Sequence, residues 1–300
     1  MRLLAIFLVL LLSSVQAEET GISYNGTQLR ANLEKSDNWP EGPMVLITHG
    51  TLAHNRMEII NTLQELFTEN GISSLAINLS LGLNNRPSSM YDCTTPHTHK
   101  HTDAIQEIGA WVQWLKHEGV KNIVLLGHSR GGNQTAWYAA EQADSSVSGV
   151  ILLAPQTWSA EYAAKDYEKR YGKSLQPILD KVLSLVKAGK GKKMLEHVDF
   201  IYCKDTTVSA EAFVSYYQAD QRLDTPYLLS RIKLPVLLFV GTEDKVVSGL
   251  QKKLDQLPRR PANLETIILE GADHFFRDLY AEDVVDKALE FISNKAQSEH

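Results

Sequence analysis

The sequence predicts an α/β fold in which helices cover both faces of a mostly parallel sheet. Apolar segments of strand length alternate along the chain with segments of helical periodicity. Strands that are apolar throughout are typical of a parallel sheet that is buried on both sides. One long stretch, from Pro155 to Ile232, breaks this alternation, with helical periodicity and no strong buried strand. A stretch of that length is too long for an ordinary connection, so we expect an inserted helical cap over about residues 156–232.

The expected elements follow one another in a regular order. Gly21–Leu33 predicts a hairpin or an edge strand before the parallel strands begin. Short apolar runs predict strands over Met44–Thr48, Ile72–Leu79, Val120–Leu126, Val147–Ala154, Leu234–Val240 and Leu264–Leu269. Apolar residues at helical spacing predict helices over Arg56–Asn70, Ala104–Glu118, Gly132–Ala143, Val247–Leu257 and Ala281–Lys295.

The first 17 residues have the pattern of a secretory signal peptide. Arg2 precedes the unbroken apolar run Leu3–Leu12, and Val15 and Ala17 stand at the −3 and −1 positions of a cleavage site. The run is too short to cross a bilayer comfortably, although an uncleaved anchor is the alternative. We therefore expect an exported protein, periplasmic or secreted, with residues 18–300 as its one domain and no integral membrane segment after cleavage.

Composition and charge narrow the classes of function. Hydrophobic residues make up 43% of the chain and charged residues 22%, which is typical of a folded domain rather than a disordered chain. The formal net charge of -6 argues against a nucleic-acid partner, because such binding depends on cationic contacts to phosphate. The sequence does not define the oligomeric state.

The chain has two cysteines, Cys93 and Cys203. An exported protein meets an oxidising compartment, in which the two thiols would be able to form a disulfide. Two unpaired thiols are the alternative, because the sequence does not reveal how far apart the two Cα atoms lie.

The segment Leu125–Gly132 carries the strongest chemical signal. It reads LLGHSRGG and places a G-x-S-x-G motif directly after an apolar strand and directly before a helix. This context predicts a sharp turn that lifts the Ser129 hydroxyl clear of the sheet, at the positive end of the following helix. Ser129 is therefore the candidate nucleophile.

A serine hydroxyl needs a base that removes its proton and an acid that orients the base. Asp244 follows the expected strand Leu234–Val240, and His274 follows the last expected strand. The order nucleophile, acid, base predicts Asp244 as the acid and His274 as the base. Glu243 is the alternative acid, but Asp244 lies deeper in the turn after the strand.

Backbone amides are expected to bind the oxyanion that forms during such a reaction. One donor would be the N–H of Arg130, the residue after the nucleophile. The second would come from the loop after Met44–Thr48, with the N–H of Thr51 preferred and that of Leu52 as the alternative.

The segments THG, GHSRGG, GTEDKVV and GADHFF, in this order, resemble the α/β-hydrolase superfamily from about Met44 onward. The resemblance implies an eight-stranded, mostly parallel sheet with a cap after the strand Val147–Ala154. It also implies a serine hydrolase that cleaves a small-molecule carboxylic ester, thioester or amide through an acyl-enzyme, without a cofactor. Many members carry HGG or HGxG in the oxyanion loop, whereas this chain has His49–Ala53, HGTLA, which leaves the second donor open.

A histidine-rich segment follows the strand Ile72–Leu79. In an extended chain, His97, His99 and His101 point to the same side, and three imidazoles together would be able to bind zinc or copper. They would equally serve to line a pocket or to hydrogen-bond to the cap, which is the more common use of such residues.

Two alternatives to a hydrolase therefore stay open. One is a catalytically idle α/β-hydrolase fold that serves for binding, because the fold alone does not determine function. The other is a metal-binding periplasmic protein that uses the His97–His101 loop on the same scaffold.

Overall fold

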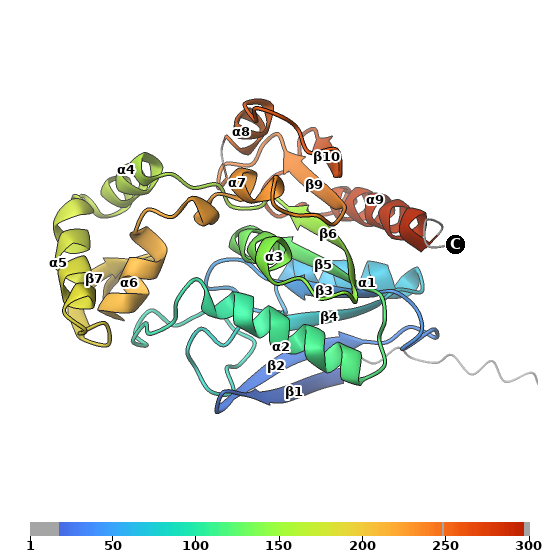
Figure 1. The fold of residues 1–300 in the computed structure, drawn as a ribbon, viewed down its shortest axis with the longest axis horizontal. Helices are drawn as coiled ribbons and strands as arrows, with labels where there is room; N and C mark the ends of the chain where they lie inside the picture. The colour runs from blue at the N-terminus through green and yellow to red at the C-terminus, as the bar shows by residue number, and fades with distance from the viewer. Residues whose placement is uncertain (1–17, 248, 297–300) are drawn as a thin grey trace, which may run out of the picture.

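The computed structural model describes residues 18–247 and 249–296. The predicted signal peptide, residues 1–17, lies outside the described residues. The described chain forms an eight-stranded sheet with helices on both faces and a cap grouped to one side (Figure 1). The predicted fold class, a mostly parallel α/β-hydrolase sheet, is confirmed. Among the described residues, no helix has both the length and the apolar composition that crossing a membrane requires.

The sheet joins an antiparallel edge to a parallel body. In spatial order its strands are β1 (Glu18–Tyr24), β2 (Thr27–Glu34), β4 (Ser73–Asn78), β3 (Met44–Thr48), β5 (Ile123–His128), β6 (Val147–Leu153), β9 (Val236–Gly241) and β10 (Leu264–Leu269). The pairs β1–β2 and β2–β4 are antiparallel, and the pairs from β4 to β10 are parallel. The loops that follow the parallel strands therefore gather at the carboxyl ends of these strands, where ligands bind in open α/β sheets.

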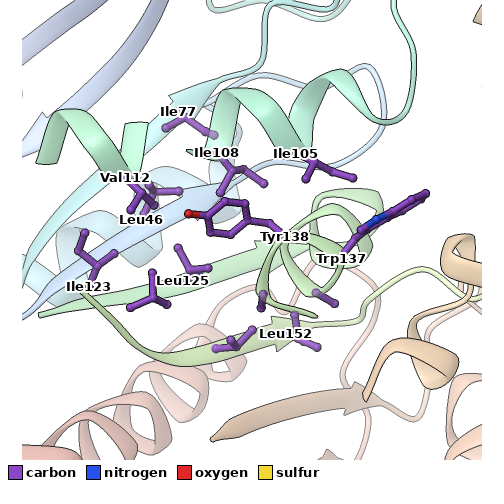
Figure 2. Packing of buried hydrophobic residues seen from close by; sticks show 14 of the residues in the cluster. Leu46, Ile77, Ile105, Ile108, Val112, Ile123, Leu125, Trp137, Tyr138 and Leu152 are labelled. Atoms are coloured by element: carbon purple, nitrogen blue, oxygen red, sulfur yellow. The ribbon is translucent and has the colours of Figure 1, made fainter. Parts of the chain in front are cut away.

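Alternate residues of the central strands pack under different helices. Leu46, Leu125 and Leu152 contribute to one apolar cluster, which includes residues of α2 (Asp103–His117) and α3 (Arg130–Glu141). Figure 2 shows three of its members, Leu125 on β5 and Ile108 and Tyr138 on these two helices, packed closely together. Successive side chains of a strand point to opposite faces, and their neighbours Ile47, Leu126 and Ile151 belong to a second cluster.

The second cluster covers the other face of the sheet. It includes residues of α1 (Glu58–Glu69) and α9 (Leu279–Ala296), which contact each other. α8 (Leu250–Asp255) lies between β9 and β10 along the chain and contributes Leu250 to the first cluster. Each fully buried leucine or isoleucine in such a core typically contributes about 2–5 kcal/mol relative to alanine.

The cap lies between β6 and β9 in the sequence. It consists of α4 (Ala160–Tyr171), α5 (Gln176–Lys187), β7 (Met194–Phe200), β8 (Cys203–Ser209), α6 (Ala210–Tyr217), a 3-10 turn η1 (Gln221–Leu223) and α7 (Thr225–Leu229). The expectation of a cap without strands was wrong, because β7 and β8 form an antiparallel hairpin. Its pairing is irregular, and the hairpin exposes Glu196, His197 and Asp205, so no continuous apolar run marks it in the sequence.

The cap has an apolar cluster of its own and is attached to the loop that follows β4. The cluster includes Phe200 and Phe213 from two cap elements. Cys93 in the loop and Cys203 at the start of β8 form a disulfide with a Cα–Cα distance of 5.3 Å. Further along the loop, the backbone of His97 pairs with β8, donating to Thr207 O at 2.8 Å and accepting from the amide of Ser209 at 2.9 Å. The loop thus extends the cap hairpin.

Candidate active site

Ser129 occupies a strained turn between β5 and α3. Its backbone has φ 58° and ψ -121°, a conformation that residues other than glycine rarely adopt. A side chain on either neighbouring glycine would prevent the turn. A Cβ atom on Gly127 would lie 2.6 Å from Gly131 O, and one on Gly131 would collide with the carbonyl oxygen of His49. The two glycines therefore permit the close approach of strand, helix and neighbouring loop that presents Ser129.

Asp244 and His274 are in direct contact. His274 Nδ1 lies 2.8 Å from Asp244 Oδ2, and both side chains are almost fully buried. Asp244 Oδ1 accepts hydrogen bonds from the amides of Val246 and Val247 at 2.7 and 2.8 Å. Burial acts to raise the pKa of Asp244, but the contact with His274 and the hydrogen bonds from the backbone amides outweigh it, and the pKa lies below its usual range. Asp244 is therefore an anion that orients the imidazole.

The alternative acid does not contact the histidine. The side chain of Glu243 is exposed to solvent, and the backbone amide of Glu243 donates to Ala272 O at 3.0 Å. Glu243 and Asp244 are adjacent in the turn, but the carboxylate of Glu243 is exposed and that of Asp244 binds His274.

Ser129 and His274 line the same cavity, which has a volume of about 630 Å³. His128, the residue before Ser129, donates from Nε2 to the carbonyl oxygen of His274 at 2.8 Å. Burial, together with the nearby His274, lowers the pKa of His128 to about 4, so this imidazole is neutral near pH 7. This contact was not predicted from the sequence. Its only signal is a polar side chain at the end of an otherwise apolar strand.

The loop after β3 lies against Ser129. Gly50 and Thr51 line the cavity together with Ser129, and a Cβ atom on Gly50 would lie 3.2 Å from the Cβ of Ser129. The side chain of Leu52, the alternative donor residue, packs into the apolar cluster of the cap. Arg130 Nε donates to Thr51 Oγ1 at 2.9 Å, so the two expected oxyanion-hole residues are linked through their side chains.

Comparison with a protein-family model identifies the chain. The family described as serine aminopeptidase, S33, matches residues 42–276, a range that contains Ser129, Asp244 and His274. The chain belongs to this family of α/β hydrolases. The resemblance inferred from the four sequence segments is thereby confirmed.

Solved structures share the fold of this S33-type hydrolase. Est1E from Butyrivibrio proteoclasticus is 21% identical with a TM-score of 0.64, and the alignment covers 92% of this chain and 99% of that one. The hydrolase GrgF from Penicillium sp. sh18 is 18% identical with a TM-score of 0.67, covering 94% and 99%. The Pyrococcus furiosus esterase Pf2001 is 17% identical with a TM-score of 0.61, covering 94% and 91%. A search of curated proteins returned no significant match.

A buried arginine contacts the loop after β3 of this hydrolase. Arg86 donates to the carbonyl oxygen of Ala53 at 2.8 Å, and its Nη2 lies 3.2 Å from His49 Nε2. The amide of Leu79 donates to the same imidazole nitrogen at 3.1 Å. Burial lowers the pKa of Arg86 to about 10, so the guanidinium stays charged at neutral pH. Arg86 lies outside the recognisable motifs, and the sequence analysis did not find it.

The three histidines of the loop are buried and hydrogen-bonded in series. His97 Nδ1 lies 3.1 Å from His99 Nε2, and His99 Nδ1 lies 2.8 Å from the hydroxyl of Tyr216 on α6. His101 Nε2 lies 2.9 Å from Asn133 Oδ1 on α3. Burial lowers the pKa of all three imidazoles, to about 4 for His97 and about 3 for His101, so they are neutral.

This arrangement joins the loop to the cap and to α3. Within residues 18–247 and 249–296, no group of three or more His, Cys, Asp or Glu side chains is arranged to hold a metal ion. The hydrogen bonds of the three imidazoles are those expected of side chains that attach the loop to the cap and to α3.

Proposed function

We propose that this protein is an exported serine hydrolase that cleaves a carboxylic ester through Ser129, His274 and Asp244. The observation that carries the proposal is the 2.8 Å contact between Asp244 and His274, beside a cavity whose wall also holds Ser129 on its strained turn. A nucleophile, a base and a buried acid in this order have the arrangement that acyl transfer requires.

The arrangement supports a two-step reaction. Asp244 holds Nδ1 of His274, which leaves Nε2 to take the proton of Ser129 as its Oγ attacks the ester carbonyl. The backbone amides of Arg130 and Thr51 hold the resulting oxyanion, and each such donor typically contributes about 10²–10³ in rate. His274 then protonates the leaving alkoxide, and water hydrolyses the acyl-enzyme by the reverse sequence of proton transfers.

The charges around the cavity favour an ester over a peptide with a free N-terminus. An aminopeptidase substrate carries a protonated amine, for which a free carboxylate in the site is favourable. Asp166 lines the cavity but is paired with Arg170 at 2.6 Å, and Asp244 is engaged by His274. One solved structure of Est1E, which shares the fold, holds ferulic acid. A small-molecule substrate fits a cavity of this volume.

Export is part of the proposal. The signal-like pattern of the first 17 residues supports it, and so does the Cys93–Cys203 disulfide, because disulfides persist mainly in oxidising compartments. Expression of the full chain with a processing assay tests it. Cleavage after Ala17 and recovery outside the cytoplasm are expected, and retention of the uncleaved chain would contradict export.

The catalytic proposal is tested with p-nitrophenyl esters from acetate to palmitate, comparing the wild type with Ser129→Ala. The wild type should cleave at least part of the series, and the variant should lose about 10³ or more of that rate. Labelling by a fluorophosphonate probe, which needs an activated serine, should be lost in the same variant. If the wild type neither cleaves an ester nor reacts with the probe, the fold serves for binding instead.

A further inference from the structure

The cavity at Ser129 carries a charge opposite to that of the whole chain. Among the residues that the structure describes, its lining includes four cationic side chains, Lys165, Lys169, Arg170 and Lys245, but only one carboxylate, Asp166. The chain as a whole has a formal net charge of -6. A cationic cleft in an acidic protein attracts anions locally, because low-dielectric walls focus the field.

Two of these cations are already paired. Arg170 Nε binds Asp166 at 2.6 Å, and the guanidinium lies 4.6 Å from the ring centroid of Tyr202. Lys165 binds Glu161, one helical turn away on α4, at 2.6 Å. These pairs hold the two cations on the cap.

The other two cations, Lys169 and Lys245, differ in this respect. Both side chains are exposed, and neither has an ion-pair partner among the residues that the structure describes. Lys169 belongs to α4 of the cap, whereas Lys245 follows Asp244 in the turn after β9. The two lysines therefore approach the cavity from different parts of the fold, the cap and the sheet.

We propose that the substrate of this site is an ester that also bears a negatively charged group, which Lys169 and Lys245 bind. This inference rests on the hydrolase activity proposed above and specifies its substrate class. Apolar side chains that line the cavity, among them Met57, Ile60 and Phe275, would contact the uncharged body of the substrate. The free cations would bind the anion, as lysine binds anions through a compact point charge.

The test compares matched neutral and anionic esters. p-Nitrophenyl hexanoate and mono-p-nitrophenyl adipate have acyl chains of equal length and differ by a terminal carboxylate on the acyl side. Phenyl acetate and 3-acetoxybenzoate differ by a carboxylate on the alcohol side. kcat/KM is measured for each pair with the wild type, with the double variant Lys169→Gln/Lys245→Gln, and with Lys121→Gln. Lys121 is an exposed lysine just before the amino end of β5, whereas Ser129 follows the carboxyl end of the same strand, so Lys121→Gln controls for the removal of a positive charge distant from the site.

The wild type should prefer the anionic ester in at least one pair, and the double variant should lose most of that preference. Exposed charge pairs are weak, so each lysine should contribute roughly up to fivefold, and the preference should shrink as salt is added. Lys121→Gln should keep the wild-type preference.

The outcomes separate this inference from the proposed function. Ser129-dependent cleavage without any preference for an anionic ester would overturn the substrate class and leave the hydrolase assignment intact. A parallel fall of both rates in the double variant would also contradict the inference, since it would indicate altered packing of the cap rather than lost anion binding. Failure to cleave any of the four esters, together with absent fluorophosphonate labelling, would overturn both proposals.

Discussion

Arg130 Nε donates a hydrogen bond of 2.9 Å to Thr51 Oγ1. The same guanidinium lies 5.0 Å from the ring centroid of Tyr216 on α6, and its Nη1 lies 3.4 Å from His101 Nδ1. One side chain therefore joins the turn at Ser129, the loop after β3, the cap and the histidine-rich loop. Arg130 thus makes side-chain contacts at the candidate site in addition to the backbone role proposed for its amide.

Thr51→Val should lower kcat by about tenfold with little change in KM. The variant keeps the backbone amide but removes the hydroxyl that accepts from Arg130, so the loop would hold the amide less precisely where charge develops in the transition state. Steady-state kinetics on a p-nitrophenyl ester measure the effect, and Thr51→Ser, which restores a hydroxyl, should recover most of the rate. Equal kcat values for Thr51→Val and the wild type would show that this hydrogen bond does not position the loop.

Asp244→Asn should lower kcat by about 10⁴. An amide in place of the carboxylate would favour the wrong tautomer of His274 and would no longer stabilise its cation. Glu243→Gln is the matched control, because it makes the same chemical change one residue earlier at an exposed position. Its kcat should equal that of the wild type. If Glu243→Gln were the slower variant, Asp244 would not be the acid.

Glu107 predicts a pH dependence of stability. Burial raises the pKa of Glu107 to about 7, although hydrogen bonds from the amide and hydroxyl of Ser80 oppose the shift. In the unfolded chain a glutamate titrates near 4.3. Between these values the folded state holds a proton that the unfolded state has lost, so the free energy of unfolding falls as pH rises. The full contribution over this window is on the order of 3 kcal/mol.

Glu107→Gln should remove this contribution, because glutamine does not titrate. Urea denaturation at pH 5, 6 and 7 should show that stability decreases less steeply with pH in Glu107→Gln than in the wild type. Glu69→Gln, at an exposed position in the last turn of α1, should keep the wild-type slope. Identical slopes for Glu107→Gln and the wild type would mean that Glu107 titrates near its ordinary value in the folded protein.

Loss of the disulfide should lower the free energy of unfolding by about 2–5 kcal/mol. The two cysteines are 110 residues apart in the sequence. A disulfide that closes so long a loop lowers the conformational entropy of the unfolded chain considerably. Cys93→Ser/Cys203→Ser and the wild type treated with a reductant should show the same reduced stability in urea. A double variant as stable as the oxidised wild type would show that packing alone holds the cap.

The parallel sheet was predictable because its strands are apolar on both faces. The expected strand Leu264–Leu269 has the same bounds as β10, and the expected strand Met44–Thr48 has those of β3. The turn at Ser129 was predictable for a steric reason, since Gly127 and Gly131 stand where side chains would collide with the backbone. Asp244 and His274 could be predicted as the candidate acid and base because each follows a recognisable strand.

Features that depend on contacts distant in sequence were not predictable. Arg86 contacts the backbone of Ala53 and the ring of His49, and both partners lie more than 30 residues away in the sequence. No pattern around Arg86 indicates these contacts. The hairpin of β7 and β8 packs against residues of α5 and α6 in the apolar cluster of the cap. Its strand pairing is irregular, so apolar and polar residues do not alternate regularly along its sequence. His128 stands at the variable position of the nucleophile motif, and the motif specifies nothing about its contact with His274.

The Cys93–Cys203 bridge also has a consequence for limited proteolysis. Exposed residues Gly172, Lys173 and Ser174 connect α4 to α5, and they lie between the two cysteines in the sequence. A protease that nicks the chain there would produce two fragments, each of which carries one of the bridged cysteines. The fragments would migrate as a single band in a non-reducing gel and separate only after reduction. A nicked molecule would therefore keep its cap covalently attached to the domain that carries Ser129.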